Sequence, residues 1–391
     1  MPFFSLNQKL LLQKLNICNQ VSPKKSEVEM FTFTKVEVKD GVATFSAINT
    51  NIFYQTQVKI QNLDLTENIS FLIKTDVFAS SVGLIIDENV GLEANFDKST
   101  LLVQGAKSKH TLRIDTSNLD RFTLPEHKSD NILAQTRIIT SDLLNSIKTS
   151  QISVGLPKNI YQPEFLNICF TLRPEEEKIL IVSTDRYRIT RNVNVANFSQ
   201  LSQEFKEREN HNFLINPKSL QLLNSIDDTE KSIELSFEKD FLWINFEESK
   251  LVLKYGEGKY PDYDKIIPQT FTCSYLANTK DLLNSLKQVY LFARTNAINR
   301  SVSLKVDPKE NKITFSAQTQ DGYASESSMD IENYEGVQEE WTQAFNADYL
   351  IDYINISSQS KVLWEANPGK PSVLSPENKK AEQLYLVSGL K

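Results

Sequence analysis

The sequence predicts an α+β protein in which one unit of roughly 130 residues occurs three times, each unit containing a helix-plus-strands module twice. Three observations support this fold class. The heptapeptide DLLNSIK at residues 142–148 returns as DLLNSLK at 281–287. Each third of the chain also contains two segments in which apolar and polar residues alternate, joined by a polar turn. A second helical segment, which follows an aromatic strand end, occurs in each third as well. The low similarity between copies indicates an old duplication.

The first helix of each unit is predicted by apolar residues at i, i+3 and i+4 spacing in residues 6–16, 141–150 and 279–290. Ser141 and Thr279 precede apolar-periodic runs, so we expect them to cap the second and third of these helices. The helices are amphipathic, and each therefore needs a sheet to cover its apolar face.

A hairpin follows each first helix. Residues 31–50, 165–185 and 302–320 alternate between apolar and polar side chains around a polar turn, which is typical of two antiparallel strands. In the first hairpin the polar turn is Lys39-Asp40-Gly41.

A second helical segment completes each unit. Residues 71–85, 213–226 and 344–356 begin at an aromatic strand end and continue into an apolar-periodic helix. Phenylalanine stands at the matching place each time, as Phe71, Phe213 and Phe345.

The connectors between the units are also alike. DRFTLPEH (120–127) and GKYPDYDKIIP (258–268) both combine aromatic residues, acids and proline, which favours an extended link. The predicted domains are therefore an N-terminal domain at residues 1–131, a central domain at 132–269 and a C-terminal domain at 270–391.

Composition excludes several classes of protein. No run approaches the ~18 apolar residues that a membrane helix needs, so we expect no membrane partner. The first 18 residues have lysines within their apolar run and no small-residue cleavage site, and three widely spaced cysteines suit a reducing cytosol. A cytoplasmic location follows. The net charge of −7 has the wrong sign for a protein whose whole surface binds nucleic acid.

The chain lacks the constellations that catalysis needs. There are three isolated histidines and no nucleotide-binding, metalloprotease or nucleophile-elbow motif, and the cysteines match no metal-ligand spacing. Asp185 beside Arg186 and Arg188 is best interpreted as a charge-paired turn. The sequence therefore predicts a binding protein that is not an enzyme, with no cofactor and no metal.

Four segments resemble the DNA polymerase III beta subunit of bacteria, the sliding clamp: VSTDRYRIT (182–190), FLINPKSLQLL (213–223), GKYPDYDKIIP (258–268) and AFNADYLIDYI (344–354). They occur in the family's order, and the resemblance spans the chain. It implies the DNA-clamp (processivity) fold, with three similar domains per chain. Two chains would join head to tail as a homodimeric ring with helices inside and sheets outside.

The resemblance also implies a function and partners. The ring would encircle double-stranded DNA without reading its sequence, and it would confer processivity as a non-catalytic accessory subunit. Expected partners are the clamp loader complex, the alpha subunit of the replicative polymerase and other proteins with a clamp-binding motif.

A DNA channel requires positive charge on the helices. Across the six predicted helices, seven lysines stand against five aspartates, so the helices carry +2 and the rest of the chain −9. These lysines are Lys9, Lys14, Lys74, Lys148, Lys218, Lys280 and Lys287. Lys24 and Lys25 match a basic loop position of the family, and Arg137 lies just before the second-domain helix.

Two further sites follow from the resemblance. Leu112, Leu291 and Phe292 are expected near the dimer interface, where ordinary core positions are an equally good interpretation. The second site is a pocket for short partner peptides, whose matched positions are Leu166, Thr184, Arg188, Ile189, Pro261, Lys265, Ile266, Leu386 and Leu390. Apolar residues with a few polar groups suit an extended peptide with hydrophobic anchors.

The pocket departs from the family pattern at two places. Arg186-Tyr187 replaces Gly-His, and the chain ends in Ser388-Gly389-Leu390-Lys391 in place of Met-Pro-Met-Arg-Leu. We therefore expect a retained pocket with altered peptide specificity.

Two other classes of protein are compatible with parts of the sequence pattern. A protein-binding repeat scaffold without a DNA role fits the acidic balance. A β-rich hydrolase or carbohydrate-active protein needs paired carboxylates in one cleft, and the repeats contain no asymmetric acid pair that suggests one.

Overall fold

The computed structural model describes residues 3–64, 68–158, 162–226, 231–295, 300–378 and 383–390. By its internal contacts the chain divides into two compact units. The first unit comprises Met1–Ser141, Ala196–Glu209 and Lys218–Tyr255, and the second comprises Asp142–Val195, Asn210–Pro217 and Gly256–Lys391.

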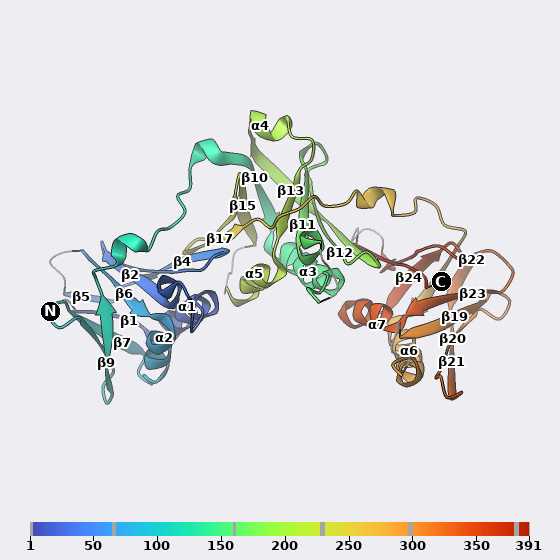
Figure 1. The fold of residues 1–391 in the computed structure, drawn as a ribbon, viewed down its shortest axis with the longest axis horizontal. Coiled ribbons are helices and arrows are strands. Elements are labelled where there is room, and N and C mark those ends of the chain that lie inside the picture. Colours follow the sequence, from blue (N-terminus) through green and yellow to red (C-terminus); the bar gives the residue numbers. More distant parts are fainter. Residues whose placement is uncertain are drawn as a thin grey trace. The chain divides into compact units, whose positions relative to one another are not determined.

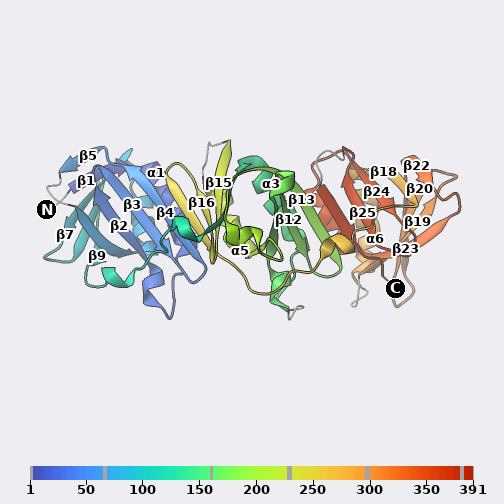
Figure 2. The same ribbon diagram turned by 90° about the horizontal axis from the view of Figure 1, so that it is seen from above.

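The first unit is built from antiparallel strands, with α1 and α2 side by side on one face (Figures 1 and 2). Its N-terminal elements are β1 (Phe3–Asn7), α1 (Gln8–Val21), β2 (Phe33–Lys39), β3 (Val42–Ile48), β4 (Ile52–Lys59), β5 (Asn62–Asp64), β6 (Ile69–Lys74), α2 (Thr75–Gly83), β7 (Asn89–Asn95), β8 (Thr100–Gln104) and β9 (Lys109–Asp115). Later segments add β10 (Ile132–Ile139), α4 (Gln203–Lys206), most of α5 (Pro217–Gln221), β15 (Ser232–Glu238), β16 (Phe241–Asn245) and β17 (Ser249–Lys254). Helix α1 packs beside α2 and against β3 and β4.

The second unit has the same strand-then-helix organisation. It begins with most of α3 (Thr140–Ser150), β11 (Ile168–Arg173), β12 (Lys178–Thr184), residues 188–195 of β13 (Arg188–Leu201) and β14 (Asn212–Ile215). It continues with β18 (Cys273–Asn278), α6 (Thr279–Ala293), β19 (Ser301–Asp307), β20 (Lys312–Gln318), β21 (Ala324–Asp330), β22 (Glu332–Gly336), β23 (Trp341–Asn346), α7 (Ala347–Ile356), β24 (Lys361–Ala366), β25 (Ser372–Pro376) and β26 (Gln383–Val387).

The predicted strand ends that run into a second helix are confirmed: α2 and α7 begin directly after β6 and β23, and α5 begins at the second residue after β14. Helices α1, α3 and α6 also begin directly after a strand, which was not predicted. The three aromatic strand ends lie in β6, β14 and β23, where Phe71, Phe213 and Phe345 are buried. In the segment predicted at 213–226, the α-helix is shorter than the apolar pattern predicts. Helix α5 ends at Gln221, and a 3₁₀ turn, Leu222–Ser225, follows it.

The predicted hairpins are also confirmed, as the pairs β2–β3, β11–β12 and β19–β20. In the first, Asp40 and Gly41 both have a positive φ, which the turn between adjacent strands requires.

The expected helix caps were wrong. Helix α3 begins at Thr140, so Ser141 lies inside it, and α6 is capped by Asn278, whose side chain accepts hydrogen bonds from the backbone N–H groups of Lys280 and Asp281. Asn7 and Asn346 cap α1 and α7 in the same way. An asparagine oxygen satisfies N–H groups that have no partner within the helix, so the repeated asparagine was the available signal.

The core of the C-terminal part of the chain lies between the sheets and helices α6 and α7. Tyr275, Trp364 and Tyr385 are fully buried there, and the rings of Tyr353 and Tyr385 stack 4.7 Å apart. No helix of the described residues is long and apolar enough to cross a membrane, and these residues contain no cluster of acids, histidines and cysteines that could hold a metal ion.

Candidate peptide-binding site

The candidate site lies in the second unit, on the sheet that joins β12, β13 and β26. Strand β13 pairs with β12 along one edge and with β26 along the other, which places Ile189 opposite Leu386. Both side chains are almost fully buried, at 3% and 1% exposure. The register therefore brings together two predicted pocket residues that lie nearly 200 positions apart in the sequence.

Alternation along β13 gives its two faces different chemistry. Thr190, Asn192 and Asn194 face helix α3 and the turn after it, where they meet Ser153 (2.6 Å), Thr149 (3.1 Å) and Ser146 (2.9 Å) in side-chain hydrogen bonds. Each buried hydrogen bond of this kind stabilises by about 1 kcal/mol net and costs more if one partner is lost. Ile189, Arg191 and Val193 alternate with them and belong to the opposite face.

The connector predicted from its aromatic and proline residues crosses that opposite face. The hydroxyl of Tyr260 donates to the carbonyl oxygen of Val182, and that of Tyr263 donates to Thr171. Burial raises the pKa of Tyr263 to about 12, and it raises the pKa of Tyr260 as well. Both hydroxyls are therefore protonated at neutral pH and can donate. Ile189, Leu386, Tyr260 and Tyr263 form one apolar cluster with Ile267.

The other predicted pocket residues border this cluster. Pro261 is half-buried, and Ile266 is 49% exposed on the connector. Leu166 follows Phe165, whose ring lies 6.5 Å from that of Tyr260. Lys265 is bound to Asp262 at 2.8 Å within the connector, so its ammonium group is already paired.

The turn between β12 and β13 holds Thr184 and the unusual Arg186-Tyr187 pair. Arg186 has φ of 79°, a left-handed conformation that favours glycine. The turn is fixed by side-chain oxygens: Thr184 accepts from the N–H of Arg186, and Asp185 accepts from the N–H groups of Tyr187 and Arg188.

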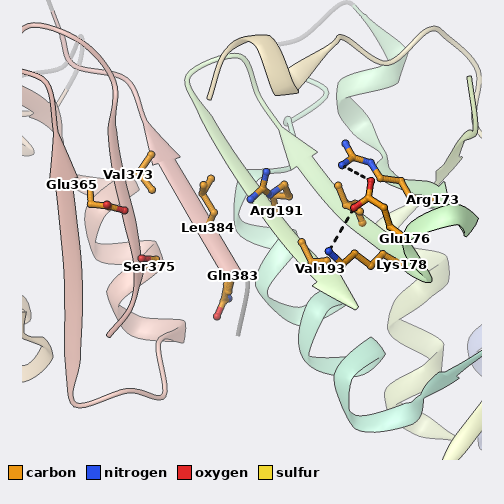
Figure 3. A pocket seen from close by; sticks show the side chains of 11 residues that line it. Arg173, Glu176, Lys178, Arg191, Val193, Glu365, Val373, Ser375, Gln383 and Leu384 are labelled. Atoms are coloured by element: carbon orange, nitrogen blue, oxygen red, sulfur yellow. Dashed lines mark hydrogen bonds and ion pairs between the residues drawn. The ribbon is translucent and has the colours of Figure 1, made fainter. Parts of the chain in front are cut away.

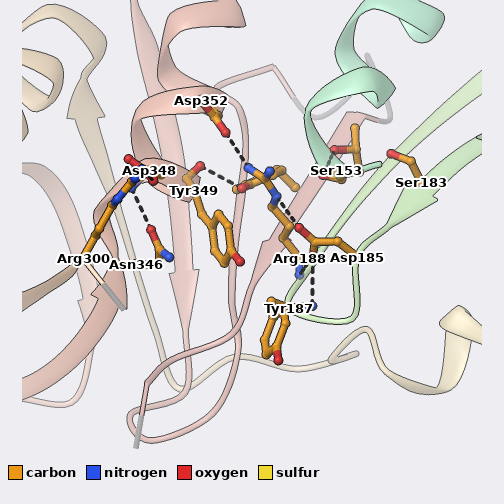
Figure 4. A network of polar contacts seen from close by, with 12 residues as sticks. Ser153, Ser183, Asp185, Tyr187, Arg188, Arg300, Asn346, Asp348, Tyr349 and Asp352 are labelled. Atoms are coloured by element: carbon orange, nitrogen blue, oxygen red, sulfur yellow. Dashed lines mark hydrogen bonds and ion pairs between the residues drawn. The ribbon is translucent and has the colours of Figure 1, made fainter. Parts of the chain in front are cut away.

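Arg188 is the centre of a polar network (Figure 4). Its guanidinium donates to Asp185 at 2.9 Å and to Asp352 of α7 at 2.7 Å, and it lies 4.3 Å from the ring centre of Tyr349. Burial raises the pKa of Asp185, and the charge of Arg188 offsets only part of that rise. Arg188 is 9% exposed, so its role is to hold the turn against α7.

Two aromatic residues at this site were not predicted. Tyr187, which is 52% exposed, stacks on Tyr349 with ring centres 6.5 Å apart. Tyr187 thus places a phenol ring where the family motif has histidine. The only signal in the sequence was this departure from the family motif, since nothing indicated that Tyr349 of α7 would lie beside it.

The end of the chain is fixed next to the same turn. The N–H of Ser388 donates to the carbonyl oxygen of Tyr187, and the N–H of Leu390 donates to that of Ala344 in β23. A Cβ at position 389 would lie 2.3 Å from the amide nitrogen of Gln343, so a larger residue there would displace that side chain and its hydrogen bond to the carbonyl oxygen of Lys370.

A separate hollow of about 350 Å³ lies on the sheet of β12, β13, β25 and β26 (Figure 3). Leu180, Val193 and Leu384 form its apolar part. Its cations are compensated: Arg173 bonds to Asp264 at 2.5 Å, and Arg191 lies 3.9 Å from the same carboxylate. This hollow therefore has no excess charge to attract an ion.

The lysines predicted to face DNA occupy different environments. Most of the set is exposed: Lys9, Lys24, Lys25, Lys74, Lys148, Lys218, Lys280 and Lys287. Lys14 is buried instead, and its ammonium lies 3.5 Å from Ser249 and 3.7 Å from Glu248. Arg137 is exposed and lies 3.8 Å from Glu234.

The residues predicted for the dimer interface lie at sheet edges or on an exposed helix face. Leu112 is half-buried on β9, which pairs with β8 along Lys109–Arg113. Leu291 is 59% exposed on α6, and Phe292 packs partly against the core. Among the described residues, β21 near α6 pairs only with β20, so it is an edge strand.

Comparison with known proteins identifies relatives of the chain and solved structures that share its fold. Residues 264–387 match the family described as DNA polymerase III beta subunit, C-terminal domain. The beta sliding clamp of Streptococcus pneumoniae is 22% identical over 396 residues, covering 99% of each chain, and that of Haemophilus influenzae is 23% identical, covering 90% of this chain and 89% of its own.

Solved structures have the same fold over the whole chain. The DNA polymerase III beta subunit of Pseudomonas aeruginosa superposes with a TM-score of 0.85 at 14% identity, covering 100% of both chains. The beta subunit of Streptococcus pyogenes gives a TM-score of 0.87 at 19% identity, also covering 100% of both. The chain therefore has the fold of the DNA sliding clamps. Within that class, the protein it resembles is the beta subunit of bacterial DNA polymerase III, and the resemblance inferred from the sequence is confirmed.

The network around Arg188 makes a testable prediction about stability. Arg188→Gln leaves Asp185 and Asp352 without their common partner, and loss of one member of a buried ion pair costs about 3 kcal/mol. We expect this loss in the free energy of unfolding, measured by urea titration in a Trp243→Phe background, where the fluorescence comes from Trp341 and Trp364 of the second unit. The exposed neighbour Arg186→Gln is the control, and an unchanged urea midpoint in Arg188→Gln would contradict the role given to this network.

Proposed function

We propose that this chain is a sliding clamp for DNA polymerase, a non-catalytic scaffold that encircles double-stranded DNA in the cytoplasm and confers processivity. The observation that carries the proposal is the full-length agreement with solved clamps, together with the repeated strand–helix units. We further propose the three similar domains at residues 1–131, 132–269 and 270–391. Two chains are needed, because the proposed ring is a head-to-tail homodimer.

The helices supply the electrostatic requirement for such a ring. A clamp that slides needs modest attraction to phosphates and no contacts to bases. The ion pairs of Asp352 with Arg188 and of Asp348 with Arg300 neutralise two of the five helix aspartates. Lys14 is buried and lies 3.7 Å from Glu248, so it is not available to phosphates. We therefore propose the exposed lysines as the DNA-facing set and omit Lys14.

Closure of the proposed ring uses the edges of β9 and β21. An edge strand has unpaired backbone groups and readily joins another strand. The exposed Lys109 and Arg113 make the β9 edge basic, whereas the exposed Glu326 and Asp330 make the β21 edge acidic. Opposite charges favour pairing of β9 of one chain with β21 of another. Leu112, Leu291 and Phe292 would supply apolar contacts beside the strands.

Partner proteins would bind at the site around Ile189 and Leu386. These two residues form an apolar floor, and Pro261, Ile266 and Leu166 form a partly exposed border. A linear peptide with hydrophobic anchors fits this chemistry. We propose the alpha subunit of the replicative polymerase, the clamp loader complex and other proteins with a clamp-binding motif as its ligands.

The first test concerns topology. After loading by a clamp loader complex, we expect the protein to remain on circular plasmid DNA during gel filtration and to dissociate when the plasmid is cut once. The physical reason is that a closed ring leaves DNA only by opening or at an end. Retention that is indifferent to cutting would favour a protein-binding scaffold with no encircling role.

The second test concerns the dimer. Arg113→Glu places like charges at the proposed interface and is expected to raise the dimer dissociation constant about tenfold, which equals about 1.4 kcal/mol. Sedimentation equilibrium measures this change, and the wild-type species should have twice the chain mass. Lys39→Glu on the β2–β3 turn is the control for charge alone. Equal effects of both substitutions, or a monomeric wild type, would refute this interface.

The third test concerns the peptide site. Ile266→Asp introduces a charge at the apolar border and is expected to weaken a consensus clamp-binding peptide about tenfold, as measured by calorimetry. Val195→Asp, at another exposed apolar residue of the second unit, should leave the affinity unchanged. Wild-type binding no stronger than that of a scrambled peptide would refute retention of the usual consensus.

A further inference from the structure

The first unit contains a cavity of about 500 Å³ that is open to solvent. Its floor is formed by Ile48, Phe53 and Val252, all of which are at most 8% exposed. Phe31 and Phe241 are half-buried beside it. A cavity of this size with an apolar floor and aromatic walls is typical of ligand sites.

The cavity arises because the first unit repeats the construction of the candidate peptide site. Strand β4 pairs with β17, which places Phe53 opposite Val252, as β13 pairs with β26 in the second unit. The connector at residues 119–125 then covers part of this sheet, where Phe122 is buried beside Trp243. Tyr260 and Tyr263 of the other connector do the same over their sheet.

The rim of the cavity is polar but uncharged. Asn49, Thr50, Asn51 and Thr123 line it, together with the apolar Leu124 of the connector. The side-chain oxygen of Asn49 accepts from the N–H groups of Asn51 and Ile52, which fixes the β3–β4 turn at the entrance. Asn51 and Thr123 are exposed, so their side chains are available to a ligand backbone.

The chemistry of the lining identifies the kind of occupant. Among the lining residues of the described chain no side chain carries a charge, so a charged anchor would lose its hydration without gaining a partner. An uncharged anchor gains the hydrophobic free energy of burial instead. Amide and hydroxyl groups at the rim are suited to the backbone of an extended peptide.

We propose that this cavity is a second docking site, which takes a short segment of a partner protein through one or two uncharged aromatic or large aliphatic side chains. The proposal concerns a surface separate from the candidate peptide site and from the proposed dimer edges. It rests on the lining of the cavity, and the parallel with the second unit supports it.

The probe for this site is the uncharged peptide acetyl-SGFLFGS-amide. We expect saturable binding by calorimetry, with shifts of the Ile48 and Ile52 methyl signals in NMR spectra of the methyl-labelled protein. Leu124→Asp should weaken the binding about tenfold, because it places a charge against the apolar anchor. Thr123→Arg places a charge at an exposed position of the rim and should also weaken the binding of the probe. Because the side chain of Thr123 is exposed, we expect this variant to fold normally.

The matched control is Ile266→Asp, which makes the equivalent change on the connector of the second unit. It should weaken the consensus clamp-binding peptide and leave the probe-induced shifts of the Ile48 and Ile52 methyl signals unchanged. If the proposed function is wrong, the consensus peptide does not bind. If this proposal is wrong, the uncharged probe does not bind at the cavity. Binding of the probe that survives both first-unit substitutions, or that is lost in Ile266→Asp, would overturn the proposal. A change of solution mass in Thr123→Arg with unchanged probe affinity would overturn it as well, because the occupant would then be a second copy of the chain.

Discussion

The hydrogen bonding of β13 to its hairpin neighbour β12 and to β26, which is distant in sequence, is the constraint on which the second unit depends. This strand pairs with β12 along residues 189–195 and with β26 along residues 188–192. Because both edges are used, its register fixes which side chains face α3 and which face the connector. A shift of one residue would turn Thr190 and Asn192 toward the connector and bury Arg191 against α3. The site around Ile189 therefore exists only in the observed register.

The same register explains why a charged network is tolerated at the end of β13. Arg188 follows a turn whose backbone donors are satisfied by Asp185, and its guanidinium reaches Asp352 on α7. Two carboxylates and an aromatic face surround one guanidinium, so the buried charge has several partners. The planar guanidinium group suits this arrangement better than an ammonium, since it donates in two directions and stacks on Tyr349 at once.

Much of the fold could be predicted because it depends on local periodicity. Alternation predicted the hairpins, and i, i+3, i+4 spacing predicted the helices, since each element is repeated and buries one face. The helix starts were less certain: Thr279 was expected to be a cap, but Asn278 has the backbone geometry and the side-chain oxygen that reach the free N–H groups.

The candidate site could be predicted only in part. Ile189 and Leu386 were identified by resemblance, and pairing of their strands brings them together. The stacking of Tyr187 on Tyr349 and the bond from Arg188 to Asp352 depend on how α7 lies against the β12–β13 turn, which no local pattern in the sequence specifies. The environment of Lys14 could not be predicted from a local pattern either. A lysine on an amphipathic helix is usually solvated, but here the side chain extends along the apolar face to Glu248.

The internal ion pairs would reconcile an acidic chain with the proposed DNA partner. A protein of net charge −7 has to restrict positive potential to one surface if it is to hold phosphates weakly. Asp348 and Asp352 lie on α7, and each is compensated by an arginine from outside that helix. The compensation removes negative charge from a helix without adding a lysine that would increase attraction to phosphate. Each phosphate contact steepens the dependence of binding on salt, so a ring that must slide benefits from few such contacts. In the proposed ring, neutralisation of acids and sparing use of lysines would meet one physical requirement, which is that enclosure and not affinity keeps a clamp on DNA.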